Sequence, residues 1–174
     1  MSRTISLTSR GEVEVYQFSW PVSIGVPLLA VFVQVFVSKW LGFIRIFDLP
    51  LLVTIFFAVA RRRPIPGLLT GAVIGTLQDI FSGTYIGLNG IAKTMVGFLA
   101  SSLGVRIDVD VPGSRFLMTF AFSLIHRVFY MMINRGLVAA NEPWNWGHTL
   151  VSAVANGLVA VILFAGLDRL KQRP

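Results

Sequence analysis

The sequence predicts an all-α, polytopic membrane protein that forms a single integral membrane domain over residues 1–174. Hydrophobic residues make up 55% of the chain and charged residues 13%, whereas a soluble domain carries roughly 25% charged residues. Apolar segments approach the length of about 20 residues that a membrane-spanning helix needs. The net charge of +7 comes from Lys and Arg at the ends of these segments, which indicates contact with a lipid bilayer and no nucleic acid.

Six transmembrane helices are expected, and each follows from an apolar run. The first run, 15–38, is uncharged over 24 residues, too long for a cleaved signal peptide, so we interpret it as an anchor. The second is the shortest, with an uncharged part of only 12 residues at 49–60. Asp48 and Pro50 are typical of a helix start, and Arg61 can extend the span by snorkelling. The expected spans are 18–38, 48–63, 64–82, 86–105, 114–133 and 147–167.

The distribution of basic residues predicts the orientation of these spans. Six spans place both termini on one side, and that side carries ten of the Lys and Arg residues that flank the spans, against three on the other. Cytoplasmic connections are enriched in Lys and Arg, so we expect both termini in the cytoplasm. The ten are Arg3, Arg10, Arg61, Arg62, Arg63, Arg106, Arg115, Arg169, Lys171 and Arg173, and the three are Lys39, Arg45 and Arg135.

Small residues recur every fourth position in the third and fourth spans. Residues four apart share one face of a helix, and stripes of small residues let membrane helices approach closely. The predicted helix-packing stripe consists of Gly67, Gly71 and Gly75 on the third span and Gly97 and Ser101 on the fourth.

Charged residues continue these stripes. Asp79 follows Gly75 by four residues, and Lys93 precedes Gly97 by four. In an antiparallel hairpin that turns near Thr84, the two charges are offset by about 6 Å along the helix axis, so we predict an Asp79–Lys93 ion pair. Polar residues of the fifth and sixth spans fall at similar depth. The predicted intramembrane polar cluster contains Asp79, Asn89, Lys93, Arg127 and Asn156. Such a cluster is either functional or a structural knot that fixes helix packing.

Motifs of catalysis and metal binding are absent from the sequence. There is no Walker A loop, GxSxG or HExxH, the chain has no cysteine, and the two histidines lack ligand spacing. We therefore expect no catalytic site, no cofactor and no metal centre.

The segment LQDIFSGTYIGLNGIAKTMVGFLASS at 77–102 resembles the central signature of the MreD family of rod shape-determining membrane proteins. The features of that signature are an acidic residue after a glycine-rich helix, a turn of small residues, and a Leu-Asn start to the next helix. The resemblance extends to the chain length and the basic turn after the second span. The residues that carry it best are Gly75, Asp79, Gly83, Gly87 and Asn89.

This resemblance implies a non-catalytic scaffold subunit of the bacterial cell-elongation complex, located in the inner membrane. Its implied partners are MreC by direct contact, the MreB cytoskeleton, and the RodA–penicillin-binding-protein synthase of peptidoglycan. The family is also similar in fold to substrate-binding subunits of energy-coupling-factor vitamin transporters, so a small-molecule-binding transporter subunit is the alternative. An AxxxA docking pair is missing from the first span, where the register of Ala30 continues with Gln34 and Ser38.

Two surfaces are candidates for contact with a partner. On the sixth span, Ala153 and Gly157 form a small-xxx-small pair with Ala160 beside it, which either holds a partner's helix or packs inside the bundle. In the outer connection, Trp144 and Trp146 either seat a partner segment or anchor the chain at the membrane surface.

Overall fold

The computed structural model describes residues 18–104, 111–139, 143 and 145–170, and this part of the chain is helical with no strand. The first helix runs through Trp20–Trp40, with a π-helical segment at Val33–Val37. When Trp20–Trp40 is counted as one helix, the described residues contain six main helices, which is the expected number. The elements are α1 (Trp20–Phe32), the π segment, α2 (Ser38–Trp40), a 3₁₀ segment (Gly42–Ile46), α3 (Leu49–Arg61), α4 (Pro64–Ser82), α5 (Leu88–Leu103), α6 (Pro112–Leu137), α7 (Trp146–Leu167) and a final 3₁₀ turn (Asp168–Leu170).

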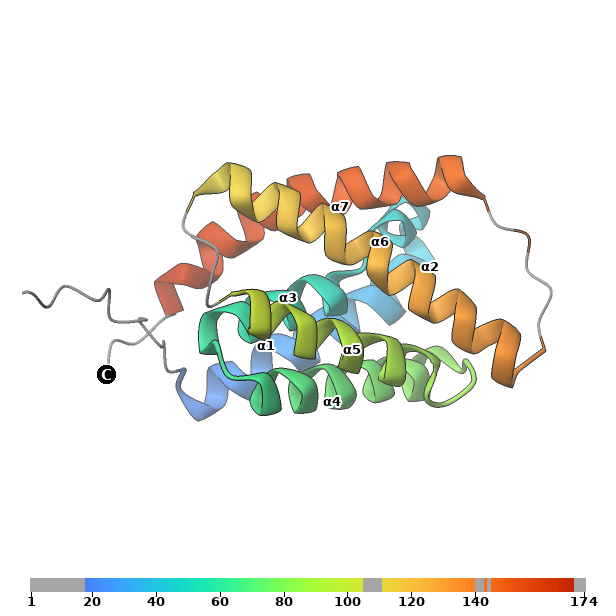
Figure 1. Cartoon of the computed structure of the whole chain (residues 1–174), viewed down its shortest axis with the longest axis horizontal. Coiled ribbons are helices and arrows are strands. Elements are labelled where there is room, and N and C mark those ends of the chain that lie inside the picture. Colours follow the sequence, from blue (N-terminus) through green and yellow to red (C-terminus); the bar gives the residue numbers. More distant parts are fainter. Residues whose placement is uncertain (1–17, 105–110, 140–142, 144, 171–174) are drawn as a thin grey trace, which may run out of the picture.

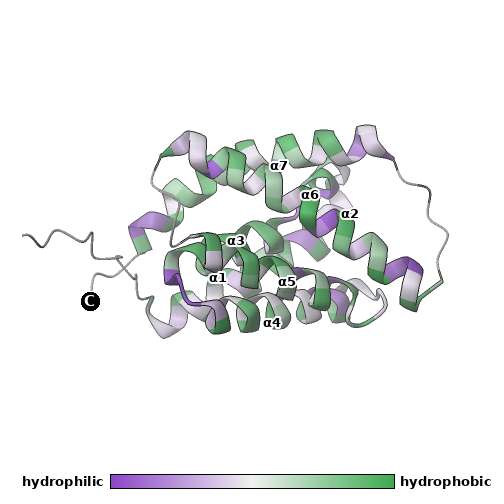
Figure 2. Cartoon of the chain, in the orientation of Figure 1, coloured by the Kyte–Doolittle hydropathy of each residue, from purple (hydrophilic) through white to green (hydrophobic). Residues whose placement is uncertain are grey.

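The surface of the bundle is apolar, as a lipid environment requires. Four helices are long and apolar enough to cross a membrane: Trp20–Trp40, Pro64–Ser82, Pro112–Leu137 and Trp146–Leu170. Large hydrophobic side chains on these helices are exposed, and polar residues such as Lys93 are buried. Figure 2 shows α7 as hydrophobic along its length and hydrophilic at both ends. Three tryptophans at helix ends, Trp20, Trp40 and Trp146, are also exposed, which is typical of residues at a membrane interface.

The helix at the expected span 48–63 is shorter than predicted. Helix α3 has 13 residues, about 20 Å at 1.5 Å per residue, so the helix alone does not cover a hydrocarbon core of about 30 Å, and the preceding segment 41–48 accounts for the remaining depth. Residues 50–60 are all buried, and α3 packs against α1, α4, α5, α6 and α7. Figure 1 shows it in the middle of the bundle, between α6 and α7 on one side and α4 and α5 on the other. It is therefore a short helix at the centre of the bundle.

Helix α5 is also shorter than the predicted span 86–105, with 16 residues at Leu88–Leu103. The predicted spans 64–82 and 147–167 match α4 and α7 closely, and α6 extends beyond 114–133 at both ends. In Figure 1 the α4–α5 turn and the start of α7 lie at one end of the bundle. The α3–α4 turn and the end of α7 lie at the other. At this second end, Arg61 donates to Ser23 Oγ and Thr70 Oγ1, which joins α3 to α1 and α4.

The glycine stripe forms the interface between α4 and α5. A Cβ atom added at Gly67 would lie 2.5 Å from Ser101 Oγ and 2.6 Å from the Gly97 carbonyl oxygen. A Cβ at Gly71 would collide with the carbonyl group of Lys93, and one at Gly75 with that of Asn89. The two backbones are therefore in contact, and the stripe fixes the register in which α5 lies along α4.

We predict that Gly71→Ala destabilises the bundle, because the added methyl group meets rigid backbone in a closely packed interface. Overpacking of this kind costs about 1–3 kcal/mol. The matched control is Gly166→Ala, also on a helix, where a Cβ meets nothing within 4 Å. Thermal unfolding in detergent should show a lower Tm for Gly71→Ala than for Gly166→Ala. Equal Tm values for the two variants would contradict the close approach of α4 and α5.

Candidate functional site

Helix α3 starts inside the bundle, beside a cavity, and its first backbone N–H groups need hydrogen-bond partners from side chains. The first N–H groups of a helix lack partners within the helix, and an unsatisfied group in a membrane interior costs several kcal/mol. Side chains from three elements accept these bonds. Asn156 Oδ1 of α7 accepts from Asp48 N at 2.9 Å, and Gln34 Oε1 of the π segment accepts from Leu49 N at 3.1 Å. Asp48 Oδ1 caps the helix by accepting from Leu51 N at 3.0 Å.

The bond to Asn156 fixes the depth of this helix start. Asn156 is ten residues into α7, about 15 Å along a helix of about 33 Å, so α3 begins near the middle of the bundle. The preceding segment 41–48 enters the bundle from the end where α7 begins. Ser152 Oγ donates to the Ile46 carbonyl at 2.5 Å. Irregular backbone at membrane depth is tolerated where it is buried in protein or lines a cavity, and Ile46, Phe47 and Asp48 line the cavity described below.

The carboxylate that caps α3 forms an ion pair with Lys93. The Lys93 Nζ to Asp48 Oδ2 distance is 2.7 Å, and the lysine side chain is fully buried. Its ammonium also donates to Asn89 Oδ1 and contacts His126 Nε2, both at 3.3 Å. An ammonium can only donate, so His126 accepts through Nε2 and carries its proton on Nδ1. That nitrogen lies 3.8 Å from Asp48 Oδ2.

Asp79 does not pair with Lys93 directly, and the predicted Asp79–Lys93 ion pair is wrong. Its carboxylate accepts from the backbone N–H groups of Gly87, Asn89 and Gly90 at 2.9, 3.2 and 3.1 Å. It also accepts from Asn89 Nδ2 at 2.8 Å and from Thr84 Oγ1 at 3.1 Å. These donors belong to the α4–α5 turn and the first turn of α5, where a helix N-terminus favours a negative charge. The hairpin itself thus stabilises the buried carboxylate.

Two glycines allow the turn to fold back over Asp79. Gly83 ends α4 at φ +68° and Gly87 precedes α5 at φ +105°, a left-handed region that glycine adopts without a steric penalty. The N–H of Gly87 then points at Asp79 Oδ2. The residues that carry the MreD resemblance therefore include the carboxylate and two glycines of the turn that holds it.

Asn89 joins the two carboxylates into one network. Its side-chain nitrogen donates to Asp79, and its oxygen accepts from Lys93, which in turn binds Asp48. Asn156 extends the chain of contacts to α7 through the Asp48 backbone. Four of the five residues of the predicted polar cluster, Asp79, Asn89, Lys93 and Asn156, are thus connected through residues on α3, α4, α5 and α7.

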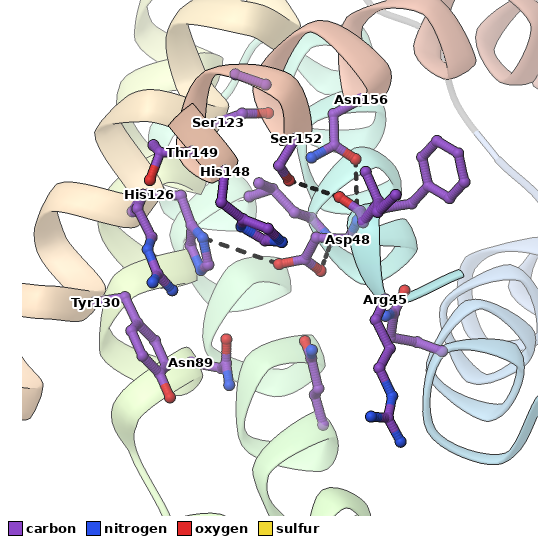
Figure 3. Close-up of a pocket in the computed structure, with 17 residues that line it drawn as sticks. Arg45, Asp48, Asn89, Ser123, His126, Tyr130, His148, Thr149, Ser152 and Asn156 are labelled. Carbon is purple, nitrogen blue, oxygen red and sulfur yellow. Dashed lines mark hydrogen bonds and ion pairs between the residues drawn. The ribbon is translucent and has the colours of Figure 1, made fainter. Parts of the chain in front are cut away.

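Arg127 is the fifth member of that predicted cluster and lies apart from the hydrogen-bonded chain. Its guanidinium carbon is 5.9 Å from the centre of the Tyr130 ring. It lines a cavity of about 240 Å³ that borders Asp48, Asn89 and His126. Figure 3 shows the labelled side chains around this cavity. Its lining residues are Gln34, Arg45, Ile46, Phe47, Asp48, Leu51, Gln78, Asn89, Ser123, His126, Arg127, Tyr130, His148, Thr149, Ser152, Ala153 and Asn156.

The predicted partner stripe on the sixth span is corrected by the structure. Ala153, Gly157 and Ala160 are buried inside the bundle, and a Cβ added at Gly157 would lie 2.7 Å from the Phe116 ring of α6. The small residues therefore let α6 and α7 pack together, so they offer no face to a partner. Trp146 is exposed, and Trp144 lies outside the described residues.

The sequence pattern indicated only a helix start at Asp48, and the predicted cluster did not include His126, although His126 lies beside Arg127 at similar depth. The sequence nevertheless contained a signal that Asp48 is a partner for Lys93. Between residues 15 and 104 it is the only carboxylate besides Asp79, so a buried Lys93 had only these two candidates in the hydrophobic region. Gln34, Gln78 and Ser123 gave no comparable signal, because single polar residues in apolar helices are common. Among the described residues, no group of three His, Asp or Glu side chains is arranged to hold a metal ion.

We predict that Lys93→Met destabilises the fold, because it leaves the largely buried Asp48 carboxylate without its cation. Removing one partner of a buried pair costs about 3–5 kcal/mol in soluble proteins. In a double-mutant cycle, adding Asp48→Asn should recover part of the loss, since asparagine still caps a helix.

The same cycle with Asp79→Asn is the control. Asp79 binds backbone groups rather than Lys93, so its loss should add to that of Lys93→Met without recovery. Unfolding midpoints in detergent measure both cycles. Recovery by Asp79→Asn but not by Asp48→Asn would mean that the pairing described here is incorrect.

Comparisons with known proteins identify the family. No curated protein and no solved structure matches the chain. The family model described as rod shape-determining protein MreD matches residues 14–170. This match covers nearly the whole chain, including every described helix. The chain therefore belongs to the MreD family, which acts in the determination of rod shape in the membrane of bacterial cells.

Proposed function

We propose that the protein is a non-catalytic scaffold subunit of the cell-elongation complex, which supports peptidoglycan synthesis through contacts with MreC and the cell-wall synthase. The observation that carries this proposal is the family match over residues 14–170. The polar network agrees with a structural role. Its carboxylates are held by Lys93 and by backbone donors, so neither is poised as a general base.

The size of the cavity favours the scaffold over a vitamin-type transporter subunit. Pockets that enclose a drug-sized ligand usually measure about 300–1,000 Å³. The polar cavity measures about 240 Å³ and is smaller than this range. The cavity therefore does not enclose a whole vitamin-sized molecule.

The proposed contact with MreC lies on the membrane-facing side of α1 and α4, and its occupant is the transmembrane helix of MreC. An apolar groove of about 370 Å³ runs between these helices and includes Leu28, Leu69 and Val73, all exposed. On the neighbouring face of α1, a Cβ at Gly25 would meet nothing within 4 Å. A groove with a glycine beside it allows the close van der Waals packing that joins helices in lipid.

The proposed orientation has both termini in the cytoplasm of a multi-pass inner-membrane protein. It rests on the excess of basic residues on that side.

We predict that a reporter active only in the periplasm is silent when fused after Pro174 and active when inserted near Glu142. Activity of the fusion after Pro174 would require a different topology.

We predict that MreC is captured from the α1–α4 groove. The chain has no cysteine, so single cysteines at Leu28 and Leu69 can carry a photo-activated maleimide crosslinker in membranes of the native host. Leu158, an exposed residue on α7, is the matched control, and Trp146 tests the outer connection. Adducts to MreC should form from Leu28 and Leu69 and be absent from Leu158.

The positions that form adducts show which surface of the protein contacts MreC. Adducts from Trp146 alone would move the contact to the outer connection, and adducts from Leu158 alone would move it to α7. If none of the four positions captures MreC, direct contact at these surfaces is rejected.

A further inference from the structure

The cavity beside the start of α3 carries more positive than negative charge. Arg45 of the 3₁₀ segment and Arg127 of α6 line it, and Asp48 is the only carboxylate among its lining residues. That carboxylate is already paired with Lys93. Within the described part of the chain, neither guanidinium has a carboxylate within ion-pair distance, so two positive charges at the cavity are not compensated by protein. Arg127 is half-buried on α6, where an unpaired charge in a membrane protein is costly, whereas Arg45 is exposed.

Two polar atoms in the cavity wall also lack partners. Ser123 Oγ is buried, with the residue 7% exposed, and it has no hydrogen-bond partner among the described residues. The same holds for Gln78 Oε1. Buried polar atoms are nearly always hydrogen-bonded to protein or to ordered water, so these two atoms require a partner from outside the protein. The Ser123 hydroxyl can donate, and the Gln78 amide can present its NH₂ after rotating. Figure 3 shows Ser123, His148 and Thr149 around the same space.

We infer that this cavity binds an oxyanion of the phosphate type, held by Arg45 and Arg127 with the Ser123 hydroxyl as a further donor. Guanidinium groups recognise phosphate through paired N–H bonds. The volume of about 240 Å³ accommodates a phosphate or pyrophosphate group but not a large molecule, so the rest of any larger ligand stays outside. The anion is either a soluble phosphate or the headgroup of a membrane lipid. This inference goes beyond the scaffold role and stands or fails independently of the contact with MreC.

The experiment uses the full chain in nanodiscs of phosphatidylcholine, titrated with inorganic pyrophosphate by calorimetry. We expect saturable binding that weakens about tenfold or more in Arg127→Gln and in Arg45→Gln, because each change removes a charged hydrogen-bond donor. The control is Lys39→Gln. It removes the same charge at the same end of the bundle, but Lys39 does not line the cavity. Circular dichroism of each variant checks that its fold is retained.

A second arm distinguishes the source of the anion. Nanodiscs that contain phosphatidate, a lipid with a phosphomonoester headgroup, should raise the Tm of the wild type and of Lys39→Gln more than that of Arg127→Gln. Pyrophosphate binding assigns the site to a soluble anion, and a response to phosphatidate alone assigns it to a lipid headgroup. If neither ligand has an effect, or if Arg127→Gln and Arg45→Gln both behave like Lys39→Gln, the inference is overturned.

Discussion

The need to satisfy the backbone at the start of α3 is the constraint on which the interior of this protein depends. A helix that begins in the middle of a membrane protein presents N–H groups that lack partners within the helix, at a depth where an unsatisfied group is costly. Asp48, Gln34 and Asn156 accept bonds from these groups. Because these residues come from three different elements, the helix start also ties the first helix and α7 to the centre of the bundle.

A charged cap creates a second requirement, because a buried carboxylate is unfavourable without a cation. Lys93 supplies this cation, and its ammonium also donates to Asn89 Oδ1 and contacts His126 Nε2. Asn89 Nδ2 in turn donates to Asp79, whose charge is stabilised by backbone N–H groups. Each polar group in this series provides a hydrogen-bond or ion-pair partner for the group before it. The network therefore follows from one short helix in a low-dielectric interior, where unpaired polar groups are costly.

The glycine stripe makes this network possible. Gly71 lies against the backbone of Lys93, and Gly75 against that of Asn89. Larger residues at these positions would push α5 away from α4. The stripe and the network thus act together, since one sets the register of the hairpin and the other uses that register to align Asn89 with Asp79.

The sequence by itself determined the membrane class, the helical fold, the family and the position of most helices, because hydrophobicity and small-residue spacing are local properties of the chain. It also indicated the glycine stripe and the members of the polar cluster. Only the tertiary structure decided that α3 begins halfway through the bundle, that Lys93 pairs with Asp48, and that Ala153, Gly157 and Ala160 face inward. These outcomes depend on which residues from distant segments reach the same depth and face. That information lies in the packing of helices and is not carried by the pattern of any single one.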